Sequence, residues 1–174
     1  CRVWWVFEEI SWRNFPHRIA ASPPGEVVFQ GASELTLDAK GRVAVPTRHR
    51  DALASAGGSV VLTAHPDRCV LLYPRLSWEP IGAKVQALSS FNEQARMWQR
   101  LLVGFAEELE LDAQGRILIS PALRKFGNLR KSVMFVGQGS HFEIWDCEAW
   151  EAKLSDALVM VGSAPPPGTE NFSL

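Results

Sequence analysis

The sequence of 174 residues contains little cysteine, almost no net charge and no long apolar run. Its three cysteines, Cys1, Cys69 and Cys147, are widely spaced and form no Cys-x-x-Cys pair, which excludes the common zinc and redox motifs. We expect a reducing, cytoplasmic environment in which Cys69 and Cys147 pack as small apolar groups. No run of about 18 apolar residues could form a membrane-spanning helix. The composition, 47% hydrophobic and 21% charged, is typical of a soluble globular protein.

The sequence also lacks the patterns of a catalytic, metal-binding or nucleotide-binding site. His49, His65 and His141 are scattered, without the His-x-x-x-His or His-Glu-x-x-His spacing of a metal site. The segment Gly137-Gln138-Gly139 lacks the lysine and the helix start of a phosphate-binding loop. No nucleophile, base and orienting acid converge. The sequence therefore predicts no catalytic residues, no metal, no cofactor and no small-molecule substrate.

The chain is organised around a repeated segment. Leu37 to Pro46 reads LDAKGRVAVP and Leu111 to Pro121 reads LDAQGRILISP, with the turn shifted by 74 residues. In both copies apolar residues alternate with polar ones before and after the turn, which is the two-residue period of half-buried strands. Each copy is therefore predicted to form a β-hairpin that is followed by a short helix.

Each predicted turn has an aspartate and a glycine at fixed positions. Asp38 and Asp112 can accept backbone N–H bonds as the first turn residue. Gly41 and Gly115 can adopt the positive φ that closes the turn. These four residues are therefore predicted to form the turns and not to take part in chemistry.

The residue after each turn glycine is an arginine, Arg42 or Arg116. Alternation places it on the strand face opposite the apolar residues, so that a rigid strand holds the cation. A guanidinium can bind phosphate or a guanine edge with two hydrogen bonds, while Lys40 supplies a point charge for the DNA backbone. The alternative is a salt bridge from each arginine to the hairpin aspartate or to a neighbouring subunit. Lys40 is matched by Gln114, so the two turns need not contribute equally.

Basic residues are concentrated around the two turns, although the net charge is −1. Residues 38–50 and 112–131 hold nine Lys or Arg against two Asp, which leaves nine basic and 17 acidic residues elsewhere. Because this charge recurs at equivalent positions, it favours a nucleic-acid interface over a solvated surface. The candidate DNA-binding residues are Lys40, Arg42, Arg48, Arg50, Arg116 and Arg124. The alternative for Arg48, Arg50 and Arg124 is that they solvate short helices.

The paired Asp-x-x-Gly-Arg hairpins, each followed by a short helix, resemble the swapped-hairpin domain of the SpoVT-AbrB type. From Val28 onward, with the opening FQGASELTLDAKGR, the chain resembles the MraZ family of bacterial transcriptional regulators. The resemblance implies an α+β fold of two tandem swapped-hairpin half-domains related by a pseudo-twofold axis, with helices after each. It also implies a nucleoid-associated ring of identical subunits that binds DNA at direct repeats upstream of its own division and cell-wall gene cluster. The other interpretation is an oligomeric assembly module whose hairpins contact proteins.

The repeats divide the chain into four parts. Residues 1–27 end in a Ser-Pro-Pro-Gly break and are expected to be dispensable, either as an overextended start or as an amphipathic appendage. Residues 28–105 are the first half-domain with its linking helices, and residues 106–158 are the second. Residues 159–174 are rich in proline and are predicted to be a mobile tail.

Further elements follow from local patterns. Apolar residues spaced by three or four from Ile81 to Phe105 predict two helices, which break near Ser90 because Ser90 and Glu93 resemble a capping box. Asp146 is predicted to cap the last helix. The predicted inner strands are Val60–Thr63, Cys69–Tyr73, Val133–Val136 and Phe142–Trp145.

Overall fold

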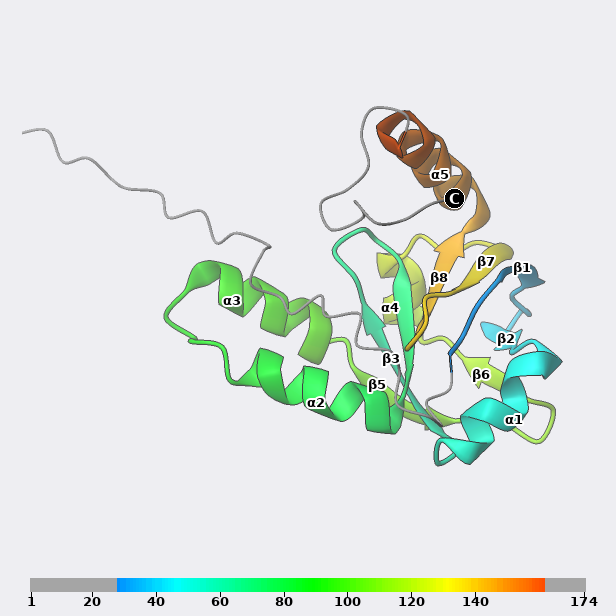
Figure 1. The fold of residues 1–174 in the computed structure, drawn as a ribbon, viewed down its shortest axis with the longest axis horizontal. Helices are drawn as coiled ribbons and strands as arrows, with labels where there is room; N and C mark the ends of the chain where they lie inside the picture. The colour runs from blue at the N-terminus through cyan, green and yellow to red at the C-terminus, as the bar shows by residue number, and fades with distance from the viewer. Residues whose placement is uncertain (1–27, 162–174) are drawn as a thin grey trace, which may run out of the picture.

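The computed structural model describes residues 28–161. The predicted extension, residues 1–27, lies outside the described residues, as does the predicted tail from residue 162. The described chain forms a six-stranded antiparallel sheet, a separate two-stranded ribbon and flanking helices (Figure 1). The strands are β1 Ala32–Thr36, β2 Arg42–Ala44, β3 Ser59–Ala64, β4 Val70–Pro74, β5 Glu107–Glu110, β6 Arg116–Leu118, β7 Ser132–Gly137 and β8 Phe142–Asp146. The helices are α1 Thr47–Ser55, α2 Arg75–Gln86, α3 Glu93–Trp98 with the π-helix η2 Gln99–Val103, α4 Pro121–Phe126 and α5 Cys147–Val161.

The strand order shows that the two repeats are related by a pseudo-twofold axis. The large sheet has the order β1-β7-β8-β4-β3-β5, and β2 pairs with β6. When the strands of one repeat are exchanged for their equivalents in the other, the order reads the same in reverse. The central register pairs are Leu71 with Glu143 in the sheet and Val43 with Ile117 in the ribbon. The α+β class and the tandem half-domains are confirmed.

The strands on either side of each turn exchange partners between the repeats. β1 pairs with β7 and β2 pairs with β6, while β5 pairs with β3. The simple hairpin inferred from alternation alone is therefore wrong, whereas the exchange agrees with a swapped hairpin. Only the turn is closed locally, where the N–H of Asp38 donates to the carbonyl of Arg42 at 2.9 Å. Alternation determines which face of a strand is buried, but it does not determine which strand lies beside it.

The exchanged strands enclose the main hydrophobic core. The ribbon side and the inner face of the sheet meet in one cluster that includes Val43, Val45, Ile117, Ile119, Val60, Leu62, Phe135 and Ile144. Each such side chain stabilises the fold by roughly 1.5–3 kcal/mol when fully buried. The opposite face of the sheet is covered by α2, by α3 with η2, and by α5. Cys69 is fully buried there, as predicted, and burial raises the pKa of its thiol.

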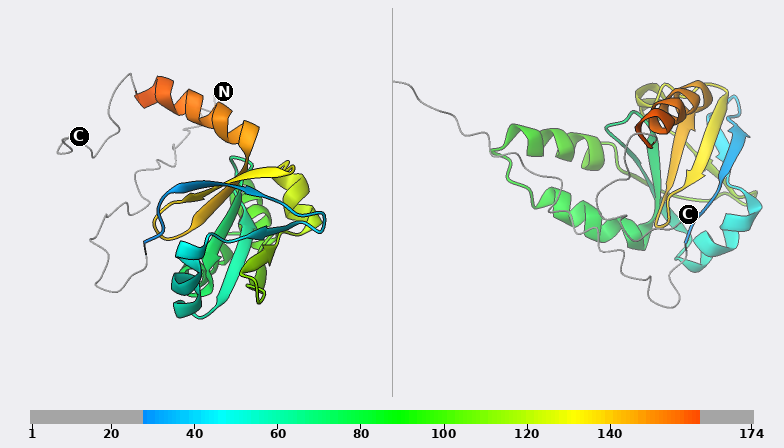
Figure 2. Two further views of the ribbon diagram at one scale, coloured as in Figure 1. Left: turned by 90° about the vertical axis from the view of Figure 1, so that its right-hand side faces the viewer. Right: turned by 45° about the horizontal axis from the view of Figure 1, so that its top comes forward.

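The region that links the two halves forms two helical segments, α2 and α3 with η2. They lie side by side and project from one side of the molecule (Figures 1 and 2). Their separation confirms the break predicted near Ser90. The predicted capping box is wrong, because Asn92 is the N-cap and its Oδ1 accepts the N–H of Ala95 at 3.2 Å. Asn92 has the extended backbone that a cap requires, and Ser90 precedes it. Phe91, between the helices, is 96% exposed, so the apolar stripe is not continuously buried.

Helix α5 begins after Asp146, which caps it as predicted. Oδ1 of Asp146 accepts the N–H of Glu148 at 3.2 Å. The same buried carboxylate forms a salt bridge with Arg130, whose hydrogen bonds lower the pKa of Asp146. The helix extends to Val161, so residues 159–161 of the predicted tail belong to this helix. No helix of residues 28–161 is both long and apolar enough to cross a lipid bilayer.

His141 precedes β8 and stacks on Tyr73, with ring centroids 4.5 Å apart. Burial, with a smaller contribution from His65, lowers the pKa of His141 from 6.5 to about 4. Below pH 6.5 the unfolded chain takes up a proton that the folded protein does not yet bind. The free energy of unfolding therefore falls as the pH decreases from 6.5 towards 4.

We expect acidification from about pH 7 to about pH 4.5 to lower the melting temperature less in His141→Phe than in the wild-type protein. Phenylalanine keeps an aromatic ring on Tyr73 but has no proton to bind. Thermal melts of both proteins at the two pH values measure the difference. Burial also lowers the pKa of His49, so part of the pH dependence remains in the variant. Equal losses in the two proteins would contradict the role of His141.

Candidate nucleic-acid interface

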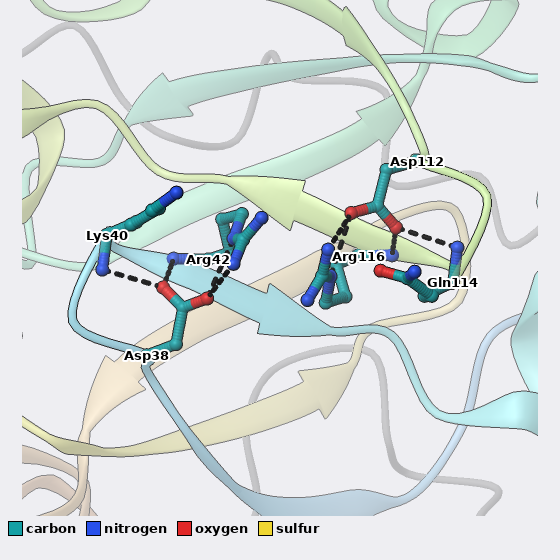
Figure 3. Close-up of polar contacts among 6 residues, drawn as sticks. All are labelled: Asp38, Lys40, Arg42, Asp112, Gln114 and Arg116. Atoms are coloured by element: carbon teal, nitrogen blue, oxygen red, sulfur yellow. Dashed lines mark hydrogen bonds and ion pairs between the residues drawn. The ribbon is translucent and has the colours of Figure 1, made fainter.

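Two turns of the same geometry lie at opposite ends of the ribbon β2–β6 (Figure 3). In the first turn, Oδ1 of Asp38 accepts the N–H of Lys40 at 2.8 Å and the N–H of Arg42 at 2.9 Å. Asp112 accepts the two equivalent bonds in the second turn, both at 2.9 Å. Gly41 has a φ of +85°, which favours glycine. Both aspartates are therefore turn-forming residues, as predicted.

Each aspartate also holds the arginine that follows the turn. Nε and Nη2 of Arg42 each lie 2.7 Å from Oδ2 of Asp38, and Arg116 makes the same contacts with Asp112 at 2.7 Å. The backbone N–H of Arg42, followed by its guanidinium, lowers the pKa of Asp38 to about 2. The guanidinium of Arg116 is the main cause of the same shift in Asp112, whose pKa is also about 2. The salt bridge considered as an alternative is thus present, and an ionised carboxylate fixes each arginine.

Arginines from the short helices cross to the turn of the other repeat. Nε of Arg124 donates to the carbonyl of Ile119 at 3.1 Å, and a Cβ added at Gly41 would lie 2.7 Å from its Cζ. Arg50 approaches Gly115, where φ is +70° and a Cβ would lie 2.5 Å from Nε. Each turn glycine therefore leaves room for a guanidinium as well as taking a positive φ. This contact could not be predicted from the sequence, because the two partners lie in different repeats.

The outward face of the ribbon combines cationic and apolar residues. Val43 and Ile117 are fully buried, so the residues beside them point away from the core. The outward face consists of Arg42, Ala44, Arg116 and Leu118. Both arginines are 30% exposed, and Leu118 is 52% exposed. Ala44 and Leu118 are not among the candidates predicted from the sequence, although the same alternation predicts their direction.

Arg48 does not join this group. Its Nη2 donates to Oγ of Ser33 at 2.8 Å, and its Nε donates to Nε2 of His49 at 3.0 Å. It is therefore directed towards β1. Successive helix residues are rotated by about 100°, so Arg48 and Arg50 lie on different sides of α1. The candidates that gather at the ribbon and its turns are Lys40, Arg42, Arg50, Arg116 and Arg124.

The described residues offer little for chemistry in a pocket. Within residues 28–161, no three His, Cys, Asp or Glu side chains are grouped so that they could hold a metal ion. A surface hollow of about 270 Å³ lies beside Arg75, but Glu79 and Glu108 each bind that arginine at 3.1 Å. The ribbon with its two turns is therefore the candidate functional site.

We expect Gly41→Ala to destabilise the protein more than Gly57→Ala does. Both glycines have positive φ, +85° and +101°, but nothing lies within 4 Å of a Cβ at Gly57, whereas Arg124 occupies that space at Gly41. The backbone strain, about 1–2 kcal/mol, is therefore shared, and the excess measures displacement of the guanidinium. Urea unfolding of both variants gives the comparison. Equal losses would show that Arg124 moves aside freely.

Comparison with known proteins agrees with the repeat. A family model described as MraZ protein, antitoxin-like, matches residues 28–101 and again residues 102–160. The transcriptional regulator MraZ of Methylobacillus flagellatus is 57% identical over 148 residues, which cover 84% of this chain and 100% of that protein. The proteins of the same name from Aromatoleum aromaticum and Azoarcus sp. are 49% and 48% identical over 147 residues, with the same coverage. Two matches in tandem, full-length relatives and two half-domains about one axis together show that the chain belongs to the MraZ family.

Proposed function

We propose that this protein is a sequence-specific DNA-binding regulator of transcription, which contacts double-stranded DNA through the ribbon β2–β6 and its two turns. The relatives named transcriptional regulator MraZ support the regulatory role. The DNA contact is carried by one observation, which is that Arg42 and Arg116 are fixed on the outward face of a two-stranded ribbon. The major groove of B-DNA admits a ribbon of this kind.

The charge distribution supports the same interface. Lys40, Arg42 and Arg124 lie at the first turn, while Arg50 and Arg116 lie at the second, in a chain whose net charge is −1. Positive charge on one face steers the protein towards phosphates. Each arginine on the ribbon uses two of its five N–H donors on an aspartate and retains others for DNA. Because the ion pair fixes the side chain, little rotamer entropy is lost on binding.

A single subunit offers few phosphate contacts, so we propose that several subunits act together as a ring. Such a ring would bind direct repeats upstream of the protein's own division and cell-wall genes, at the nucleoid, with each further subunit binding at high effective concentration. Exposed apolar residues at the linking helices and on α5 support association between subunits. These residues are Leu88, Phe91, Met97, Leu154 and Leu158.

The second candidate function is an assembly module whose ribbon binds another protein. It is favoured by the exposed Leu118 on the outward face, because a protein partner could bury this side chain. The DNA immediately upstream of the gene separates the two functions. Direct repeats there favour the regulator, and their absence favours the assembly module.

We expect Arg42→Ala and Arg116→Ala to weaken DNA binding while the protein stays folded. Loss of a two-hydrogen-bond contact to a base costs about 1–3 kcal/mol, and the oligomer repeats the loss in every engaged subunit. Arg42→Ala should cost more, because Lys40 makes the first turn the more cationic. DNA titrations at several salt concentrations measure affinity and salt slope, and melting curves report on folding.

Arg75→Ala is the matched control for these variants. It removes the same charge, also paired with carboxylates, from a position beside Glu79 and Glu108. Its affinity should remain close to that of the wild-type protein. If the double variant of Arg42 and Arg116 keeps the wild-type affinity and salt slope, the ribbon is not the DNA contact.

We expect the protein to form a homo-oligomer larger than a dimer at micromolar concentration. Sedimentation velocity over a range of concentrations measures the assembly. Phe91→Asp should shift the equilibrium towards smaller species, because it places a charge on an exposed apolar tip. A monomeric wild-type protein would remove the multivalent binding mechanism.

A further inference from the structure

The outward face of the ribbon is symmetric in its arginines but not in the residues beside them. The pseudo-twofold axis exchanges Arg42 with Arg116, and it exchanges Ala44 with Leu118. It also relates Lys40 to Gln114 in the two turns. A methyl group at one end of the ribbon is thus matched by an isobutyl group at the other.

Both differences place the larger or more cationic residue at the same end. In the ribbon register Arg42 lies opposite Leu118, and the carbonyl of Gly41 accepts the N–H of Ile119 at 2.9 Å. The turn that contains Lys40 therefore lies beside Leu118. At the other end, Arg116 lies opposite Ala44, next to the turn that contains Gln114. Figure 3 shows the two turns at their separate ends.

The exposed position of Leu118 on the outward face indicates an apolar partner. It is 52% exposed on the face that carries the arginines, while the residue before it and the residue after it, Ile117 and Ile119, are fully buried. In the major groove, the 5-methyl group of thymine is the apolar feature of the base edges. Arg42, directly opposite Leu118, would bind phosphate or guanine beside it.

We propose that Leu118 contacts the 5-methyl group of a thymine and, together with Lys40 at the same end, gives the ribbon a single direction on DNA. This inference rests on the proposed function. A DNA-binding surface with twofold symmetry selects a palindromic site. A ribbon with unlike ends selects a site without that symmetry, so each subunit binds its DNA segment in one orientation.

The test uses a DNA segment that the wild-type protein selects from a random pool. Each thymine is replaced in turn by uracil, which removes only the 5-methyl group. Replacing thymine by uracil at one position of the bound segment should lower the affinity of the wild-type protein about fourfold, which is the effect of losing one buried methyl group. Leu118→Ala should bind the thymine-containing DNA more weakly and should be insensitive to uracil at that position.

Two further variants complete the test. Leu76→Ala removes an exposed leucine from α2 and should keep the wild-type response to uracil. The exchange variant, Ala44→Leu with Leu118→Ala, should move the uracil-sensitive position to the other end of the bound segment. A sensitive position that stays in place in this variant would overturn the assignment to Leu118.

The outcomes separate this inference from the proposed function. If Arg42→Ala weakens binding but no thymine responds to uracil, DNA binding stands and the contact of Leu118 is overturned. A palindromic selected segment overturns the proposed direction. If Leu118→Ala leaves DNA affinity unchanged and instead lowers the oligomer size in sedimentation, Leu118 is a contact between subunits. If the wild-type protein selects no sequence at all, the proposed function itself fails.

Discussion

The exchange of strands between the two repeats is the constraint on which the rest of the structure depends. Neither half can bury its own turn-flanking strands, because β2 finds its partner in β6 and β1 finds its partner in β7. Val43 and Ile117, the central pair of the ribbon, are both fully buried under it. The hydrophobic core therefore forms only when both repeats are folded together, and the ribbon is held rigidly at the surface.

The same exchange builds the cationic site. At each turn, the aspartate, the glycine and the arginine that follows the glycine come from one repeat. A further arginine comes from the short helix of the other repeat. Arg124 lies at the turn of Gly41, and Arg50 lies at the turn of Gly115. A shift in the pairing of strands between the repeats would thus disturb the core and separate the basic groups. Folding and the proposed binding surface depend on one set of contacts.

Much of the local structure could be predicted from the sequence. The turn role of Asp38, the outward direction of Arg42 and the cap at Asp146 follow from residue type and spacing, and the structure confirms each. The helix start at Asn92 could not be chosen from the sequence, since Ser90 is an equally good cap residue. The direction of Arg48 towards β1 depends on how α1 is rotated against the sheet, which local pattern does not determine.

The sequence by itself determined the two repeats, the alternation that buries one face of each strand, and the turn chemistry. These depend on residues close together in the chain, whose backbone preferences act locally. Tertiary structure alone decided which strands pair, which arginine meets which turn, and that Leu118 shares a surface with Arg42. Those contacts join segments of different repeats, where packing of the whole core selects among registers that local alternation leaves open.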